Sequence, residues 1–405
     1  MANTLTTVNP EIWAREAERS LFVENKAMAI ANMTLRNLVA GEGDQVNRQI
    51  LSYPASSTYT PGTDITNLNI TSAQESLSIA TWFASKVTID DTEKVQSIIQ
   101  LVQNVTKKMM KDLNNRIEQV VTNETSNAQW SLDAANVGGT AGSNISVNTD
   151  NIPQIFIAAD TKLDATDAPT AGRTAVIGGH VLGTLKLQQA ARGTVFSDGV
   201  NTRGVVTSLF GWDILYSNNL PYSATLGLAT NPTATDTVTI AGVAFTFVAT
   251  LATAGDVHIC SSASATVTNF VNALNSPATA IAEASNTGYT PVSAENAFLL
   301  RDKRRLTATD NTTSIGITGY GDIVVAETFT DGTDAWSAQL QKSLFTIAGS
   351  VDIIVQIPPK IEVVRDPDQF SDIVKSLLGY GVKTFADGAR EMVYVKVDAS
   401  TSDWS

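Results

Sequence analysis

The sequence has little of what reactive or cross-linked sites are made from. Its 405 residues include one cysteine, Cys260, and two histidines, His180 and His258. A single thiol excludes an intramolecular disulfide and any zinc site that needs several thiolates. The two histidines are far apart and fall in different predicted domains, so no pair of nucleophile and base is indicated. We therefore expect no enzyme, no metal site and no cofactor.

Basic residues and long apolar runs are also scarce. The chain has 27 Lys plus Arg against 40 Asp plus Glu, a net charge of −13. This balance argues against a protein that grips duplex DNA through net charge, because such binding relies on clustered Lys and Arg. No uncharged apolar run reaches the roughly 18 residues of a membrane-spanning helix, and no basic stretch followed by an apolar block opens the sequence. We expect neither a membrane span nor a cleaved export signal.

Phosphate and metal motifs are missing or weak. The pattern G-x-x-x-x-G-K-[ST] does not occur, and the GYG triplets at 319–321 and 379–381 do not extend to G-x-G-x-x-G, so we predict tight turns at both. His258 and Cys260 would share one face of a strand and could hold a metal, but we favour a plain strand edge. The acidic run 366–372 lacks the glycine and distal glutamate of a calcium loop, which predicts a surface turn.

One basic group follows a long stretch without any. From Gly204 to Leu300 there is no Lys or Arg, and then four basic residues fall within positions 301–305. This group could contact a phosphate or an acidic neighbour. The alternative is a solvated strand end.

The chain is long enough for two or three packed units, and 43% hydrophobic residues exclude a mainly disordered protein. Helical spacing of apolar residues predicts an N-terminal arm from Pro10 to about Ala40, followed by a polar loop to Pro61. Strict alternation predicts one half-buried strand over 76–89. A helix from Asp91 to about Thr125 would then be roughly 50 Å long.

The remaining chain mixes helices and strands. We predict helices at 152–163, 181–191 and 262–275, and strands at 174–179, 210–216, on both sides of Ala241-Gly242, and within 295–321. The segment 343–357 fits a buried helix or strand, is interrupted at Pro358-Pro359, and precedes strands at 360–366, 373–385 and 390–398. The region 223–334 has ten acids and four bases, and we interpret it as a small β-rich domain inserted between two halves of another.

Several segments, in this order, resemble those of tailed-bacteriophage major capsid proteins of the variety that carries an inserted domain. NPEIWAREAERSLFVENKAMAIANMT resembles the N-terminal arm of that family, GEGDQVNRQILSYP the start of its extended loop, and WFASKVTIDDTEKVQS the return strand that joins its spine helix. ADTKLDATDAPTAGRTAVIGGHVLGTLKL with GVVTSLFGWDILYSNNLP resembles the axial domain, and IEVVRDPDQFSDIVKSLLGYGVKTF the closing strands of the peripheral domain. Together these segments cover most of the chain outside the insertion.

The resemblance implies an α+β phage capsid fold with an N-terminal arm, an extended β-hairpin loop, a long spine helix, peripheral and axial domains, and a β-rich inserted domain. It divides the chain into an arm at 1–41, an extended loop at 42–89, a peripheral domain with the spine helix at 90–150 and 361–399, an axial domain at 151–222 and 335–360, and an inserted domain at 223–334.

For function, the resemblance implies assembly into pentamers and hexamers that close into an icosahedral shell around double-stranded DNA, in the virion capsid after assembly in the host cytoplasm. Only about ten residues precede the helix predicted around Trp13, so we expect a separate scaffolding protein. A portal is a further expected partner, and a decoration protein could bind outside. DNA would be enclosed without sequence-specific contacts, because an acidic wall does not adsorb it. No membrane partner is expected.

Six aromatic residues are candidate contacts between subunits, because aromatic side chains contribute strongly to interface energy. They are Trp13, Phe22, Tyr53, Tyr59, Trp82 and Phe83. The alternative for each is an ordinary core position. A rival function is a secreted or surface-layer β-rich structural protein, which the Thr, Ser and Asn content favours and the missing export signal and long amphipathic helix do not.

Overall fold

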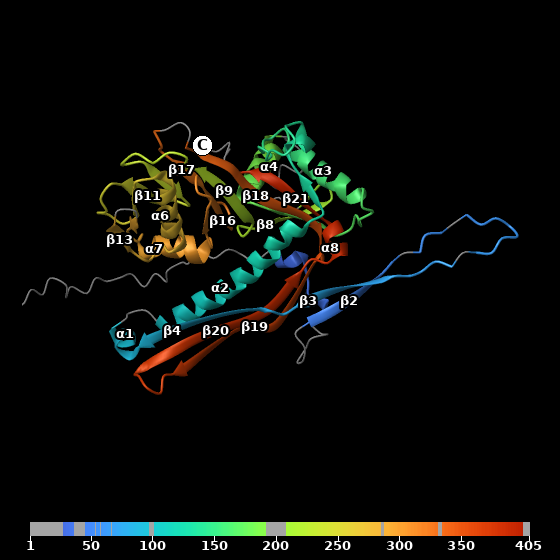
Figure 1. The fold of residues 1–405 in the computed structure, drawn as a ribbon. Coiled ribbons are helices and arrows are strands. Elements are labelled where there is room, and N and C mark those ends of the chain that lie inside the picture. Colours follow the sequence, from blue (N-terminus) through green and yellow to red (C-terminus); the bar gives the residue numbers. More distant parts are fainter. Residues whose placement is uncertain are drawn as a thin grey trace, which may run out of the picture.

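The computed structural model of the chain describes residues 27–35, 45–52, 54–56, 58–65, 67–96, 101–191, 208–284, 287–330 and 334–399. These residues form a mixed α+β fold of β-sheets and covering helices (Figure 1). The α-helices are α1 Asp91–Gln96, α2 Leu101–Asn123, α3 Ile152–Asp164, α4 Gly179–Ala191, α6 Ala263–Asn275, α7 Ala294–Ala297 and α8 Ala386–Arg390. Shorter turns are the 3-10 helices η1 Ala27–Ile30, η3 Glu124–Asn127 and η4 Ala134–Val137, and the π-helix η5 Phe298–Lys303.

A four-stranded sheet and helix α2 form one layered unit. The sheet has the order β1-β19-β20-β4, with β1 Ala31–Asn32, β19 Val351–Arg365, β20 Ser371–Lys383 and β4 Thr81–Asp90. α2 runs along one face of it (Figure 1). Met109, Leu113 and Ile117 recur at helical spacing on α2 and are buried. Burial of each such side chain stabilises the unit by about 1.5–3 kcal/mol.

The body of the molecule contains two larger sheets. One has the order β15-β16-β9-β18-β6-β8-β7, with β21 pairing to β18 and β5 to β21. Its strands are β5 Trp130–Leu132, β6 Arg173–Ile177, β7 Ser208–Leu209, β8 Trp212–Tyr216, β9 Pro221–Gly227, β15 Thr307–Asp310, β16 Ser314–Tyr320, β18 Trp336–Ile347 and β21 Met392–Asp398. The other has the order β13-β14-β12-β11-β10-β17, with β10 Thr237–Ile240, β11 Val243–Val248, β12 Asp256–His258, β13 Ile281–Ala284, β14 Thr287–Tyr289 and β17 Val325–Glu327.

Each larger sheet has its own helices and core. α3 and α4 pack against the first sheet, where Phe156 and Trp212 each meet the ring of Phe345 edge-on at 5.1 Å. α6 packs against the second, where Phe270 meets Phe245 edge-on at 5.4 Å. The core under α6 continues to apolar residues of β9 and β16, so the two sheets share packing.

Several predictions that depend on local patterns are confirmed. Helices α3, α4 and α6 occupy the expected ranges, and Ser262 caps α6 by accepting a hydrogen bond from the Ala265 amide. Ala241 and Gly242 both have positive φ, 53° and 83°, and join β10 to β11 as a two-residue hairpin.

Two predicted elements in the first part of the chain need correction, and the helix predicted from Asp91 is found over the residues described. The strand predicted over 76–89 is broken after Ser78, because β3 (Ser72–Ser78) pairs with β2 (Gln45–Leu51) while β4 pairs with β20. The part of the predicted arm helix that the structure describes, 27–35, contains η1 and β1 instead of an α-helix. The predicted helix from Asp91 is α1 followed by α2, with 97–100 outside the described residues. At 1.5 Å per residue, α2 is roughly 35 Å long.

Three further predictions, toward the C-terminal end, were wrong. The GYG triplet at 379–381 lies inside β20 instead of in a turn. The segment 294–303 is helical, as α7 and η5, where strands were predicted. β19 continues through Pro358-Pro359, and its pairing with β20 shifts register on either side of Ile357. A proline lacks the amide hydrogen that a ladder needs, and a bulge accommodates that loss.

The division into domains stays a prediction. One sheet crosses a predicted boundary, that of the inserted domain. β9, β15 and β16 lie almost wholly within 223–334, yet they belong to the same sheet as β18 and β6, which lie outside that range. The six-stranded sheet with α6 occupies 237–327 and lies beside this shared sheet (Figure 1).

Candidate assembly surface

The β2–β3 hairpin and its connecting segment project away from the body (Figure 1). At the base, Leu77 and Ile79 are buried against Ile354 and Phe385 of the same chain. Farther out, large apolar side chains are uncovered in this chain: Leu51, Ile65, Leu68 and Ile70, with Ile65 77% exposed. We call residues 51–71 the distal loop. The strand predicted over 76–89 therefore has part of its apolar face, at Leu77 and Ile79, covered by its own chain, while the distal loop carries four exposed apolar residues.

Polar contacts fix the base of the hairpin to the body. Arg48 on β2 forms an ion pair with Asp387 and lies over the ring of Phe385 at 5.3 Å. Lys383 donates to the Ser76 carbonyl at 2.7 Å, and Glu75 accepts a hydrogen bond from the Ala386 amide at 3.2 Å. The hairpin is thus held at its base while the distal loop extends beyond the body.

The six predicted aromatic contacts are not brought together. Trp13, Phe22 and Tyr53 lie outside the described residues. Tyr59 is in the distal loop and 58% exposed, and Trp82 on β4 is 49% exposed. Their contact with another chain stays a prediction.

Phe83, the sixth, turns toward α2. Its ring centre is 5.6 Å from that of Tyr380, and the guanidinium carbon of Arg116 lies 4.3 Å above the ring. Such a cation-π contact stabilises a partly exposed site by about 0.5–1 kcal/mol. Burial raises the pKa of Tyr380 to about 12.

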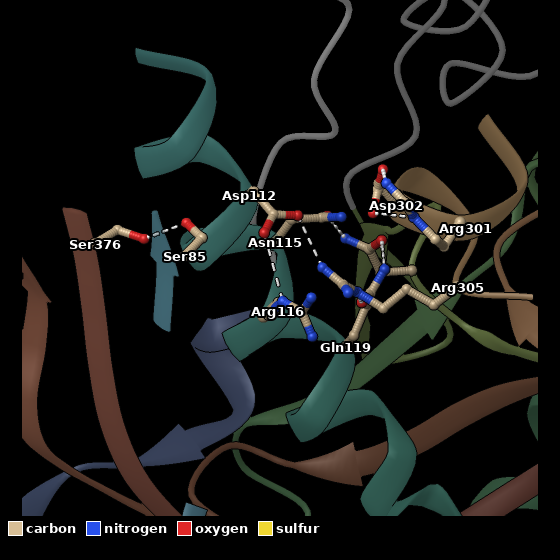
Figure 2. Close-up of polar contacts among 10 residues, drawn as sticks. Ser85, Asp112, Asn115, Arg116, Gln119, Arg301, Asp302, Arg305 and Ser376 are labelled. Atoms are coloured by element: carbon tan, nitrogen blue, oxygen red, sulfur yellow. Dashed lines mark hydrogen bonds and ion pairs between the residues drawn. The ribbon is translucent and has the colours of Figure 1, made fainter. Parts of the chain in front are cut away.

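The basic group at 301–305 contacts an acidic neighbour on α2, one of the two interpretations left open from the sequence. Arg305 donates to Asp112 at 2.8 Å and to Gln119 at 2.7 Å, and Arg116 donates to the same Asp112 at 3.4 Å (Figure 2). Burial, and then the positive charge of Arg116, lower the pKa of Arg305. Arg301, by contrast, is exposed and pairs with the adjacent Asp302.

A buried carboxylate lies one turn along α2 from these contacts. Glu118 is fully buried and accepts hydrogen bonds from the Ala27 amide at 3.0 Å, the Ser217 hydroxyl at 2.9 Å and the Asn219 amide group at 2.7 Å. A buried charge is tolerated only with such partners. α2 therefore ties together the segment that enters at Ala27, the segment 217–219 and the segment ending at Arg305.

A group of ion pairs lies where the β19–β20 hairpin meets α1. We call Asp91, Lys94, Arg365 and Asp372 the tip cluster. Hydrogen bonds from Arg365 and Lys94 hold the pKa of Asp91 well below its usual range, and the bond from Lys94 lowers the pKa of Asp372. The same bonds raise the pKa of Lys94 and Arg365. Farther along this sheet, Ser85 and Ser376 share a hydrogen bond of 2.6 Å (Figure 2).

Within the described residues there is no group of three or more His, Cys, Asp or Glu arranged to hold a metal ion. The Nδ1 atom of His258 lies 3.9 Å from the sulfur of Cys260, and that sulfur accepts a hydrogen bond from Asn269 at 3.0 Å. Burial raises the pKa of the Cys260 thiol. Across the same residues, no helix combines the length and the apolar content that a membrane crossing requires.

Sequence reasoning missed the apolar residues of the distal loop and the anchor at Arg48. The signal for the first was present: Ile65, Leu68 and Ile70 interrupt a polar segment, an unusual arrangement for a solvated loop. The partners of Arg48 could not be inferred, because Asp387 lies 339 residues away.

This architecture is a phage capsid fold. The chain is similar to a solved structure from Mycobacterium phage Che8, with a TM-score of 0.56 and 15% sequence identity over 95% of this chain and 96% of that one. It is also similar to the capsid structure of Cyanophage P-SCSP1u, with a TM-score of 0.52 and 14% identity over 95% of this chain and 91% of that one. No protein-family model and no curated protein matches the sequence. At these identities the likeness concerns the fold.

Proposed function

We propose that this chain is the major capsid protein of a tailed bacteriophage, a structural protein that self-assembles into pentamers and hexamers of an icosahedral shell. The shell packages double-stranded DNA, and the protein resides in the virion capsid. The proposal assigns no catalytic role to the chain, in line with its similarity in fold to a capsid structure.

One observation carries the proposal beyond fold: large apolar side chains of the distal loop are exposed among the residues that the structure describes. Ile65 is 77% exposed, and Leu51, Leu68 and Ile70 are each more than half exposed. Burying a large apolar side chain is favourable by about 1.5–3 kcal/mol, and exposed apolar side chains gathered in one segment are typical of surfaces of interaction. Identical subunits in a closed ring can supply the cover, each loop lying on the next copy.

We further assign the arm to 1–41, the extended loop to 42–89, the peripheral domain with its spine helix to 90–150 and 361–399, the axial domain to 151–222 and 335–360, and the inserted domain to 223–334. α2 would be the spine helix. Contacts of Arg305 and Ala27 with α2 would keep the inserted domain and the arm in fixed positions relative to the spine.

The partners follow from the same proposal. A separate scaffolding protein and a portal would direct assembly, and a decoration protein could bind the finished shell. The DNA would be enclosed without sequence-specific contacts. The net charge of −13 would keep it from adsorbing to the wall.

Electron microscopy and sedimentation of the purified full-length chain test the proposal. We expect hollow shells, tubes, or rings of five and six copies. Flat sheets would favour the surface-layer alternative, and a chain that stays monomeric at high concentration would contradict both.

A further inference from the structure

The turn between β19 and β20 holds a bare aromatic side chain in a fixed position. Phe370 is 82% exposed, while its carbonyl accepts a hydrogen bond from the Asp91 amide at 2.9 Å. The Asp366 amide donates to the Ser371 carbonyl across the turn at 3.0 Å. The tip cluster surrounds these bonds with ion pairs. Several contacts therefore hold this turn in place, although its largest side chain contributes little to the core of its own chain.

The turn is acidic as well as aromatic. Asp368 is exposed next to Phe370, and Asp366 is half-buried at the start of the turn, where it accepts a hydrogen bond from the Asp368 amide at 3.0 Å. A surface that receives this turn should combine an apolar floor with positive charge.

Such a surface lies on the same sheet, on the face turned away from α2. Strand pairing places Lys86 of β4 directly opposite Lys375 of β20, and Glu362 of β19 on the other side of Lys375. Both lysines are exposed, and like charges directly opposite each other are unfavourable until an anion joins them. Glu362 already pairs with Lys360 at 2.5 Å.

This face also has an apolar floor. Together with Lys86 and Lys375, Ala84 and Leu377 line a groove of about 410 Å³, and Trp82 lies beyond them along β4. Lys360 and Glu362 also line the groove, which therefore has three lysines and one carboxyl group above its apolar floor. In a chain of net charge −13, this excess of positive charge is matched to an acidic aromatic segment.

We propose that the turn 366–370 of one copy docks into this groove of a second copy, with Phe370 on Leu377 and Asp368 near Lys86. This inference rests on the proposed shell function and names one contact within the shell. The turn cannot reach its own groove, because Lys375 lies four positions after Ser371 on β20, roughly 13 Å along the strand. The contact is therefore heterologous, and it closes a ring when the rotation between copies allows.

Disulfide trapping in assembled full-length protein tests the contact. The chain has one native cysteine, and Cys260 is buried, so oxidation reports on introduced thiols. We expect the double variant Asp368→Cys/Lys86→Cys to give covalent multimers on a non-reducing gel. The matched control is Asp368→Cys/Val87→Cys, since the side chain of Val87 is on the opposite face of the same strand. The control should stay monomeric on the gel.

The outcomes separate the two proposals. Particles of normal shape without multimers in the Lys86 variant, or with equal multimers in the control, would overturn the docking contact and leave the shell function standing. An unmodified chain that forms no particles would overturn both proposals.

A charge exchange tests the pairing without new thiols. We expect Asp368→Lys and Lys86→Glu each to lower the yield of particles several-fold, and the combined variant to recover most of it. A combined variant no better than either single one would contradict the contact. If Lys86→Glu instead only lowered the nucleic acid that co-purifies with normal particles, the groove would be a nucleic-acid contact and the inference would be wrong.

Discussion

The indole ring of Trp82 occupies the space that a β-carbon on Gly379 would need. Built on that glycine, a β-carbon would lie 2.3 Å from the Cζ3 atom of Trp82. The two residues are direct partners on β4 and β20. A glycine within a strand ordinarily weakens it, and here the close approach of the ring explains why the position has no side chain.

We predict that Gly379→Ala destabilises the chain by about 1–2 kcal/mol, near the lower end for overpacking, because the half-exposed Trp82 can swing toward solvent. In a Trp82→Ala background the same substitution should cost less than about 0.5 kcal/mol, since the two side chains no longer compete. Urea unfolding of the four proteins in this cycle measures the coupling.

Gly381 provides a contrast in the same strand. Its β-carbon would meet the backbone carbonyl oxygen of Ser78 at 2.5 Å, and a backbone atom cannot swing aside. We expect Gly381→Ala to cost more than Gly379→Ala. Equal costs would mean that Trp82 is as firmly held as the backbone at Ser78.

The second prediction concerns the attachment of segment 298–305 to α2. Arg305→Met keeps much of the side-chain volume but removes the hydrogen bonds to Asp112 and Gln119. Hydrogen bonds to charged groups contribute about 1.5–3 kcal/mol, and the partial exposure of Asp112 places the expected loss near the lower value.

The matched control is Arg301→Met in the same basic group. Arg301 is exposed and, among the residues that the structure describes, pairs with its neighbour Asp302, so the change should stay within about 0.5 kcal/mol. Denaturant unfolding of both variants decides the matter. Equal effects would show that the two arginines act through general charge and that the contact with α2 is unimportant.

What the sequence could predict was local. Helix α6 and the turn at Ala241-Gly242 depend on residues within one short window, and both were predicted. The same is true of strands β20 and β21, whose alternating residues show their buried face.

What could not be predicted depends on distant partners. The alternation over 76–89 is continuous, yet the strand exchanges one partner for another after Ser78, and no residue inside the window encodes that exchange. A turn was predicted at Gly379 because glycine favours turns. The structure explains this glycine differently: the ring of Trp82 on β4 fills the space that a side chain would need. The contact of Arg305 with Asp112 spans 193 residues.

The third prediction is a dependence on pH at the tip cluster. The carboxyl pKa values of Asp91 and Asp372 are lowered in the folded chain, so their stabilising contribution is present at neutral pH. It decreases once the pH falls below about 4, the ordinary pKa of aspartate. It is lost when the pH also falls below the lowered pKa values of the folded chain. Because these groups are solvent-accessible, added salt should weaken the effect.

Hydrogen exchange at the Asp91 amide, which donates to Phe370, reports opening of the tip. We expect the exchange rate of this amide to rise, relative to the intrinsic rate of an unprotected amide at the same pH, as the pH falls toward 2. The rise should be smaller in Asp91→Asn. Glu391 should show the opposite dependence of stability on pH. Burial raises its carboxyl pKa, so its stabilising contribution is present at low pH and is lost as the pH rises. A tip that opens equally in the Asp91→Asn variant would rule out the cluster as its cause.

The last prediction separates apolar cover from charge in the distal loop. Leu68→Asp/Ile70→Asp places two carboxylates where exposed apolar side chains lie, and Asn67→Asp/Asn69→Asp adds the same charge at the alternate, polar positions. All four residues are exposed in the single chain, so both variants should unfold within about 0.5 kcal/mol of the parent. If neighbouring copies cover Leu68 and Ile70, each side chain contributes about 1.5–3 kcal/mol to assembly, and only the first variant should lose particles in sedimentation and electron microscopy. Equal loss in both variants would point to charge repulsion between loops, and particles unaffected by either would show that the distal loop remains uncovered in the shell.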